Sequence, residues 1–137
     1  SLKYYGYTID LWERESSDTD LAMFIQDKVK ESRSDIIVAL DDSTLEAVFE
    51  ALRVNDIAVD IYGIGSTNKI IQNLDYGIIQ SIVFQNEFIM GYLSVQELFN
   101  ENKGQVDGRV TEVEFRTINR ETMYLPNNQR LIFPIIQ

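Results

Sequence analysis

A strand-like run followed by a helix-like run recurs along most of this chain, and this repeat constrains the fold more than any other feature. Four runs, at 7–12, 35–40, 58–64 and 80–84, are rich in apolar and β-branched residues. They begin 22 to 28 residues apart, and apolar residues at helical spacing follow each one. Crossovers of this length join parallel strands, so the pattern predicts an α/β fold with a mostly parallel sheet. The runs 35–40 and 58–64 are apolar at both alternating positions, which predicts three layers, with helices on both faces.

Polar residues that can cap a helix precede each predicted helix. The expected N-caps are, in chain order, Asp18 or Thr19, Asp42 or Ser43, Ser66 or Thr67, and Asn86. The first helix is expected to end near Glu31, the third at Gly77 and the fourth near Asn102.

Both ends of the chain depart from the repeat. Leu2 and Tyr4 are typical of the end of a helix with Gly6 as its C-cap, which suggests a piece of a longer protein. Alternation over 108–118 predicts a strand, and 119–123 can form one helical turn. A turn signal at 126–128 precedes an apolar tail at 131–136. We therefore expect one α/β domain over 1–137, in which 103–137 is a tail of added strands.

The composition excludes several kinds of chemistry. The 137 residues include no cysteine and no histidine, which removes disulfides, thiolate metal sites, cysteine nucleophiles and Ser-His-Asp triads. With 12 Lys and Arg against 22 Asp and Glu, the net charge of −10 argues against binding of a nucleic acid backbone. The longest apolar runs are far below the roughly 20 residues of a membrane span. We predict a non-catalytic protein with no cofactor and no metal.

Polar residues follow each predicted strand, at the edge of the sheet where ligands of open α/β folds bind. The residues expected to contact a ligand there are Trp12, Arg14, Asp41, Asp42, Ser66 and Gln85. Asp42 and Ser66 are also good helix caps, whereas Asp41 and Gln85 precede the expected caps and are harder to explain in that way. Trp12 can stack on a sugar ring or pack against the core.

Two other interpretations of this edge are weaker. The segment Gly63-Ile64-Gly65 lacks the remaining residues of a dinucleotide fingerprint or a P-loop, so a close turn explains it better. Asp41, Asp42 and Glu87 lack the spacing of a metal-binding loop, and the two adjacent aspartates leave the strand in different directions. No acid/base pair is predicted.

The order of these motifs resembles the type 1 periplasmic sugar-binding proteins and the ligand domains of lac-repressor-like regulators. The resemblance covers 6–98 and rests on 35–47, 61–67, 74–86 and 90–92. It implies a flavodoxin-like C-terminal lobe. It also places Asp41 where the family often has a ligand-binding Asn, Asp42 at the following Asp, and Gln85 at a polar residue that contacts ligand or hinge. Gly63-Ile64-Gly65 departs from the family's Gly-Phe-Asp, whose Asp holds sugar hydroxyls.

The resemblance implies binding of a small polar solute, usually a sugar, between two lobes. The parent would be an extracytoplasmic protein of an ABC transport or sensory system that docks a membrane permease or sensor. Two alternatives stay open, namely a cytoplasmic transcription regulator, marked by an upstream helix-turn-helix, and an α/β interaction module. Because the other lobe and a central strand would be missing, exposed edges and the apolar face of 86–102 predict a homodimer or swapped assembly.

Overall fold

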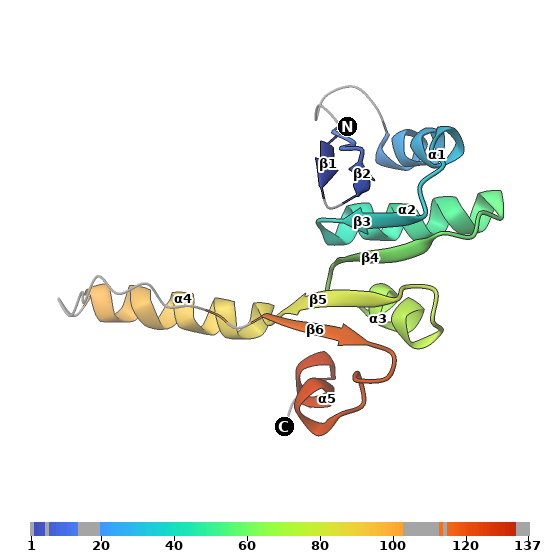
Figure 1. The fold of residues 1–137 in the computed structure, drawn as a ribbon. Helices are drawn as coiled ribbons and strands as arrows, with labels where there is room; N and C mark the ends of the chain where they lie inside the picture. The colour runs from blue at the N-terminus through green and yellow to red at the C-terminus, as the bar shows by residue number, and fades with distance from the viewer. Residues whose placement is uncertain (1, 5, 14–19, 103–112, 114, 134–137) are drawn as a thin grey trace.

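A four-stranded sheet organises the computed structural model, which describes residues 2–4, 6–13, 20–102, 113 and 115–133. The strand order is β3 (Ile36–Ala39), β4 (Asp60–Ile64), β5 (Ser81–Gln85) and β6 (Phe115–Asn119). The first three strands are parallel, and β6 runs antiparallel to β5 (Figure 1). The predicted mixed α/β fold with a mostly parallel sheet is confirmed.

Each parallel strand leads into a helix, as the sequence predicts. The described helices are α1 (Leu21–Glu31), α2 (Asp42–Asn55), α3 (Asn68–Asp75), α4 (Glu87–Asn102) and α5 (Pro126–Ile132). Thr67 caps α3 as expected, whereas Asp20 caps α1 and Asp41 caps α2, one residue away from the predicted caps in both cases. No helix in the described ranges is long and apolar enough to cross a membrane.

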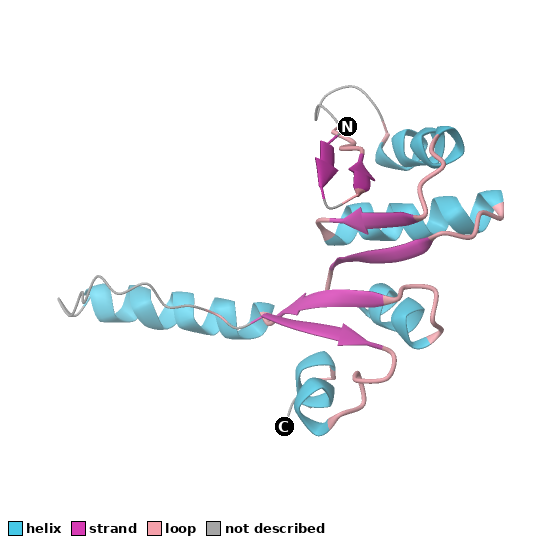
Figure 2. Ribbon diagram, viewed as in Figure 1, coloured by secondary structure: helices cyan, strands magenta, loops and turns pink. Residues whose placement is uncertain are grey.

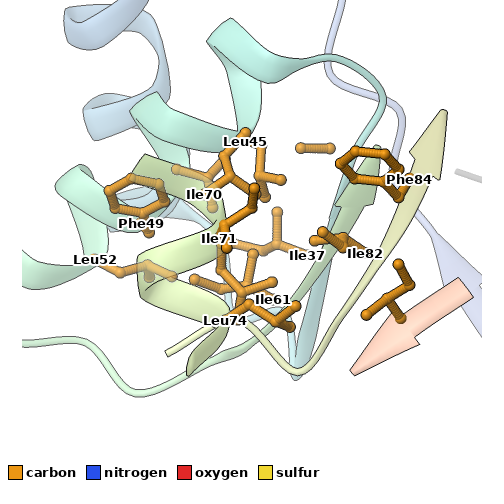
Figure 3. Packing of buried hydrophobic residues seen from close by; sticks show 14 of the residues in the cluster. Ile37, Leu45, Phe49, Leu52, Ile61, Ile70, Ile71, Leu74, Ile82 and Phe84 are labelled. Carbon is orange, nitrogen blue, oxygen red and sulfur yellow. The ribbon is translucent and has the colours of Figure 1, made fainter. Parts of the chain in front are cut away.

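One face of the sheet packs against α2 and α3 and forms the core. Alternate strand residues such as Ile37, Ile61 and Ile82 point toward these helices and are almost fully buried (Figure 3). Their helical partners recur at three- and four-residue spacing: Leu45, Val48, Phe49 and Leu52 on α2, and Ile70, Ile71 and Leu74 on α3. The packing therefore follows directly from two superimposed periodicities, two residues along the strands and 3.6 along the helices.

The opposite face of the sheet carries no described helix, as the view in Figure 2 shows. Val38 on β3 is 61% exposed, and Leu40 just after it is 67% exposed. Phe115 on β6 and Ile64 on β4 are exposed as well. The second helical layer that the sequence predicts is thus not found among the described residues.

The N-terminal segment differs from its prediction. Residues Leu2–Tyr4 (β1) and Tyr7–Ile9 (β2) pair antiparallel in a hairpin of their own, and Gly6 turns with a φ of 84°. The predicted helix end at Gly6 is wrong, and so is the prediction that 7–12 is a strand of the main sheet. A glycine at positive φ serves a tight hairpin as well as a helix C-cap, so the local signal fits both.

The C-terminal segment is partly as predicted. β6 lies within and just beyond the predicted strand 108–118, most of which is outside the described residues. The helical turn at 119–123 is confirmed by bonds from the Thr122 and Met123 amides to the Asn119 carbonyl. The turn expected at 126–128 is instead the start of α5, because Pro126 occupies a first-turn position where its missing N–H is not needed.

Candidate functional site

The carboxyl ends of β3, β4 and β5 lie side by side at one edge of the sheet, and α2, α3 and α4 each begin within three residues of that edge. We call this the carboxyl edge. It is formed by Asp41 and Asp42 after β3, Gly65 to Thr67 after β4, and Gln85, the last residue of β5, with Asn86 and Glu87 after it. The fold therefore brings together four of the six residues that were expected to contact a ligand.

Asp41 is the N-cap of α2. Its Oδ1 accepts a hydrogen bond from the Thr44 amide at 2.8 Å, and its Oδ2 accepts one from Thr44 Oγ1 at 2.7 Å. The hydrogen bond donated by the Thr44 backbone amide is the largest cause that holds the pKa of this carboxyl below its ordinary value of 3.8. The prediction that Asp42 or Ser43 caps this helix is wrong, since β3 ends one residue earlier than expected and Asp41 takes the extended cap conformation.

Asp42 joins two strand ends. It is half-buried, and its Oδ1 accepts hydrogen bonds from the backbone amides of Ser66 at 2.8 Å and Thr67 at 3.3 Å. The carboxylate of one βα connection thereby satisfies amides of the next, which holds the β4–α3 loop against the start of α2. A hydrogen bond to a charged acceptor contributes more than a neutral one, so this contact fixes the geometry of the edge.

Gly65 lets the loop come this close to Asp42. A Cβ at Gly65 would lie 2.5 Å from Cδ1 of Ile70 and 3.2 Å from Oδ1 of Asp42. Ile70 is fully buried, so it has little room to give way. Gly63 and Ile64 are the last residues of β4, so of the predicted close turn only Gly65 lies in the loop, where the lack of a side chain allows this approach.

Ser66 connects the β4–α3 loop to α4. Its Oγ donates to Oε1 of Glu87 at 3.0 Å. The next residue, Thr67, caps α3 by accepting from the Ile70 amide, and its hydroxyl donates to Glu46 at 2.6 Å. Glu87 is thus a residue of the edge that was not among the expected ligand contacts, and its position directly after the Asn86 cap was the available signal.

Gln85 ends β5 with an exposed side chain and is paired with Phe115 of β6. Trp12 is half-buried and packs against the hydrophobic core. It does not follow a strand of the main sheet, because β2 belongs to the separate hairpin. Arg14 lies outside the described residues. The structure therefore places Asp41, Asp42, Ser66 and Gln85 on one edge. It does not place Trp12 there at the end of a neighbouring strand, as the sequence predicted.

Metal binding has no geometric support in the described ranges. No three carboxylates gather there closely enough to hold an ion. Asp42 and Glu87 are both engaged by donors of the chain itself, through the Ser66 amide and the Ser66 hydroxyl. The edge is better suited to hydroxyl groups, which can both donate to carboxylates and accept from amides.

A separate hollow of about 400 Å³ lies at the opposite, amino end of the strands. Its lining residues are Ser34, Asp35, Ala58, Val59, Asp60 and Gln80. The polar groups there tie neighbouring strands together, since Gln80 Oε1 accepts from the Ile61 amide at 2.6 Å and the Asp60 amide donates to the Asp35 carbonyl. The carboxyl edge remains the better candidate, because ligands of parallel sheets bind at that end.

The comparisons with known proteins agree with this fold. No protein-family model and no curated protein matches the sequence. A carbohydrate transporter solute-binding protein of Agrobacterium radiobacter, solved in complex with D-arabinose, superposes with a TM-score of 0.74 at 21% identity, covering 82% of this chain and 39% of that one. An ABC transporter solute-binding protein of Agrobacterium vitis, bound with α-D-tagatopyranose, gives 0.70 at 15% identity over 81% and 40%.

A Mycobacterium smegmatis protein gives a TM-score of 0.53 at 19% identity, over 80% of this chain and 39% of that one. This chain thus spans about two fifths of the length of the solved proteins that it matches. The match confirms the fold that the resemblance implied, because the superposition covers about four fifths of this chain. The chain has the fold of one lobe of a type 1 periplasmic binding protein.

Proposed function

We propose that this chain, as a single domain over 1–137, is the sugar-binding C-terminal lobe of an extracytoplasmic solute-binding protein. The parent would serve an ABC transport or sensory system, dock a membrane permease or sensor, and have no catalytic activity. The observation that carries the proposal is the convergence of Asp41, Asp42, Ser66 and Gln85 on the carboxyl edge. Solved proteins of the same fold are described as bound to D-arabinose and α-D-tagatopyranose, which supports a sugar as the solute.

The dimensions of the edge suit one monosaccharide. Neighbouring strands are about 4.8 Å apart, so Asp41 after β3 and Gln85 after β5 stand roughly 10 Å apart, with Ser66 between them. A sugar placed across these three positions can donate a hydroxyl to the Asp41 carboxylate and accept from the Gln85 amide. We include Trp12 and Arg14 in the same proposed site, and Arg14 lies outside the described residues.

One lobe supplies only part of a two-lobe cleft, so the expected affinity is low. About three hydrogen bonds at 0.5–1.5 kcal/mol each correspond to millimolar binding at best. Tight binding and lobe closure would require the rest of the parent. A homodimer or exchanged assembly remains the predicted state of the isolated chain, because α4 carries exposed apolar side chains.

The test is an NMR titration of the 15N-labelled chain with D-arabinose, D-tagatose and a matched set of pentoses and hexoses. We expect millimolar, saturable shifts confined to the amides around Asp41, Ser66 and Gln85. Gln85→Ala should weaken binding several-fold, since its exposed side chain contributes to ligand contact and not to the core. Gln72→Ala, an equally exposed glutamine on α3, is the matched control and should bind as the unaltered chain does.

Two results would contradict the proposal. One is the absence of saturable shifts with every sugar up to about 50 mM, well above millimolar dissociation constants. The other is a set of shifts located away from the carboxyl edge and equal in Gln85→Ala and Gln72→Ala.

A further inference from the structure

Two apolar surfaces of this chain are left uncovered by the other residues that the structure describes. The first, which we call the open sheet face, faces away from α2 and α3. It consists of Ile36, Val38, Leu40, Tyr62, Ile64, Val83 and Phe115. Parallel sheets are normally covered on both faces, so an uncovered apolar face of this kind is the signature of a missing layer.

The second surface is one side of α4, which we call the α4 stripe. Tyr92, Val95 and Leu98 follow one another at three-residue intervals and fall on one side of the helix. Tyr92 is 61% exposed and Val95 is 67% exposed. Glu97 falls on the other side of the helix. An amphipathic helix of 16 residues gains most of its stability from packing, so this stripe too requires a partner surface.

The start of α4 prevents the stripe from folding back onto its own sheet. Only Asn86 separates Gln85 of β5 from Glu87 of α4. The Asn86 side chain accepts from the Ile89 amide at 3.0 Å, and Glu87 is tied to Ser66 at 3.0 Å. These bonds direct α4 outward from the end of the sheet, as Figure 1 shows. The stripe is therefore presented to a second molecule.

We propose that two copies of this chain associate by a reciprocal exchange, in which α4 of each copy lies across the open sheet face of the other. A two-fold axis makes both contacts identical and covers both apolar surfaces at once. None of the seven side chains that form the open sheet face is charged, and Asp60 lies beyond them at the amino end of β4. Depletion of charge at the centre of a surface is typical of protein interfaces.

The length of α4 as a whole matches the extent of the open sheet face. A helix of 16 residues is about 24 Å long. Four strands about 4.8 Å apart and roughly 17 Å long form a face whose diagonal is about 23 Å. At roughly 150–250 Å² for a fully exposed large side chain, the exposed fractions of both surfaces amount to on the order of 1,000 Å² per copy. A pair would bury about 2,000 Å², which reaches the range of stable specific complexes.

The experiment is sedimentation equilibrium of the full 137-residue chain between about 5 and 200 μM, a range that captures micromolar association. We expect a dimer of twice the 15.8 kDa chain mass. The dimer should tighten as salt is raised from low to moderate concentration, because each copy carries a net charge of −10 and screening weakens their repulsion.

Two substitutions locate the interface, with one more in reserve and one as a control. Val95→Asp on the α4 stripe and Val38→Asp on the open sheet face should each raise the dissociation constant at least about 100-fold, as expected for a charge placed in the centre of an interface. Leu40→Asp, just beyond β3, replaces Val38→Asp if circular dichroism shows that the latter does not fold. Asn100→Asp, on the opposite side of α4, introduces the same charge as a control and should leave the dissociation constant unchanged within about two-fold.

Mixing the variants distinguishes exchange from other modes. A Val95→Asp copy retains an intact sheet face, and a Val38→Asp copy retains an intact α4 stripe, so the mixture should regain association through one of the two contacts. A monomer throughout the concentration range would overturn the proposal. So would a dimer that Val95→Asp abolishes and Val38→Asp leaves intact, because it would join α4 to α4. A dimer that resists both substitutions would place the contact elsewhere and overturn it as well.

Discussion

The hydrogen bonds of Asp42 make the strongest prediction about the stability of the carboxyl edge. Asp42→Ala removes the acceptor for the Ser66 and Thr67 amides, at 2.8 and 3.3 Å. Hydrogen bonds to a charged group contribute about 1.5–3 kcal/mol, and two that share one oxygen contribute less than twice that. The carboxylate also lies in the first turn of α2, where the helix dipole adds about 0.3–1 kcal/mol. We expect a total loss of about 2–3 kcal/mol.

Urea denaturation followed by circular dichroism measures this loss. With a slope of about 1.5 kcal/mol per molar urea for a small domain, the midpoint should fall by roughly 1.3–2 M. Asp42→Asn keeps an acceptor oxygen of the same shape and loses only the charge, so it should cost about 1 kcal/mol. Asp27→Ala, which removes an exposed carboxylate from α1, is the control and should cost less than about 0.5 kcal/mol.

The comparison among these variants decides whether the reasoning holds. If Asp42→Ala costs no more than Asp27→Ala, the carboxylate does not hold the β4–α3 loop. If Asp42→Asn lowers the free energy of unfolding as much as Asp42→Ala does, the charge of Asp42 stabilises the edge and the hydrogen bonds from the Ser66 and Thr67 amides do not.

Three further predictions follow from single residues. Because the folded-state pKa of Asp41 lies below its ordinary value, its contribution to stability is present above about pH 4 and is lost as the pH falls through the folded pKa. The difference in urea midpoint between the unaltered chain and Asp41→Asn should therefore narrow from pH 6 to pH 3. Gly63→Ala should lower the free energy of unfolding by about 1–3 kcal/mol in the same urea assay, because the new Cβ would lie 2.8 Å from the Ala39 carbonyl oxygen. A loss below about 0.5 kcal/mol would mean that β3 and β4 separate easily to make room for it. Asp56→Gly should raise the melting temperature by a few degrees, because Asp56 ends α2 with a φ of 52°, a conformation that carries no steric penalty for glycine. A lower melting temperature would contradict this account.

Local patterns predicted the central βα units well. The apolar runs that became β3, β4 and β5, the Thr67 cap and the extent of α4 all depend on residues within one or two turns of each other. The errors occurred where one local signal serves two structures. Gly6 fits both a hairpin turn and a helix end, and Pro126 fits both a turn and a helix start. Either Asp41 or Asp42 can cap α2, and the residue at which β3 ends decides which of them does.

The candidate site shows the same division. The polar residues after each strand could be selected from the sequence because strand ends and helix starts are local features. Their connections could not, since the Asp42 bond to the Ser66 amide joins residues 24 positions apart and the Ser66 bond to Glu87 joins residues 21 apart. Such contacts exist only after the strands have been placed beside one another, and this is why Glu87 was not among the expected ligand contacts.

The sequence by itself determined the kinds of elements, their order along the chain and the absence of histidine and cysteine chemistry, because periodicity and composition act locally. Only the tertiary structure decided which strands are neighbours, that β6 runs antiparallel, which aspartate caps and which one ties two loops together. It also decided that one face of the sheet is covered and the other is open. These properties depend on which distant surfaces meet and exclude water, and a run of neighbouring residues does not encode that on its own.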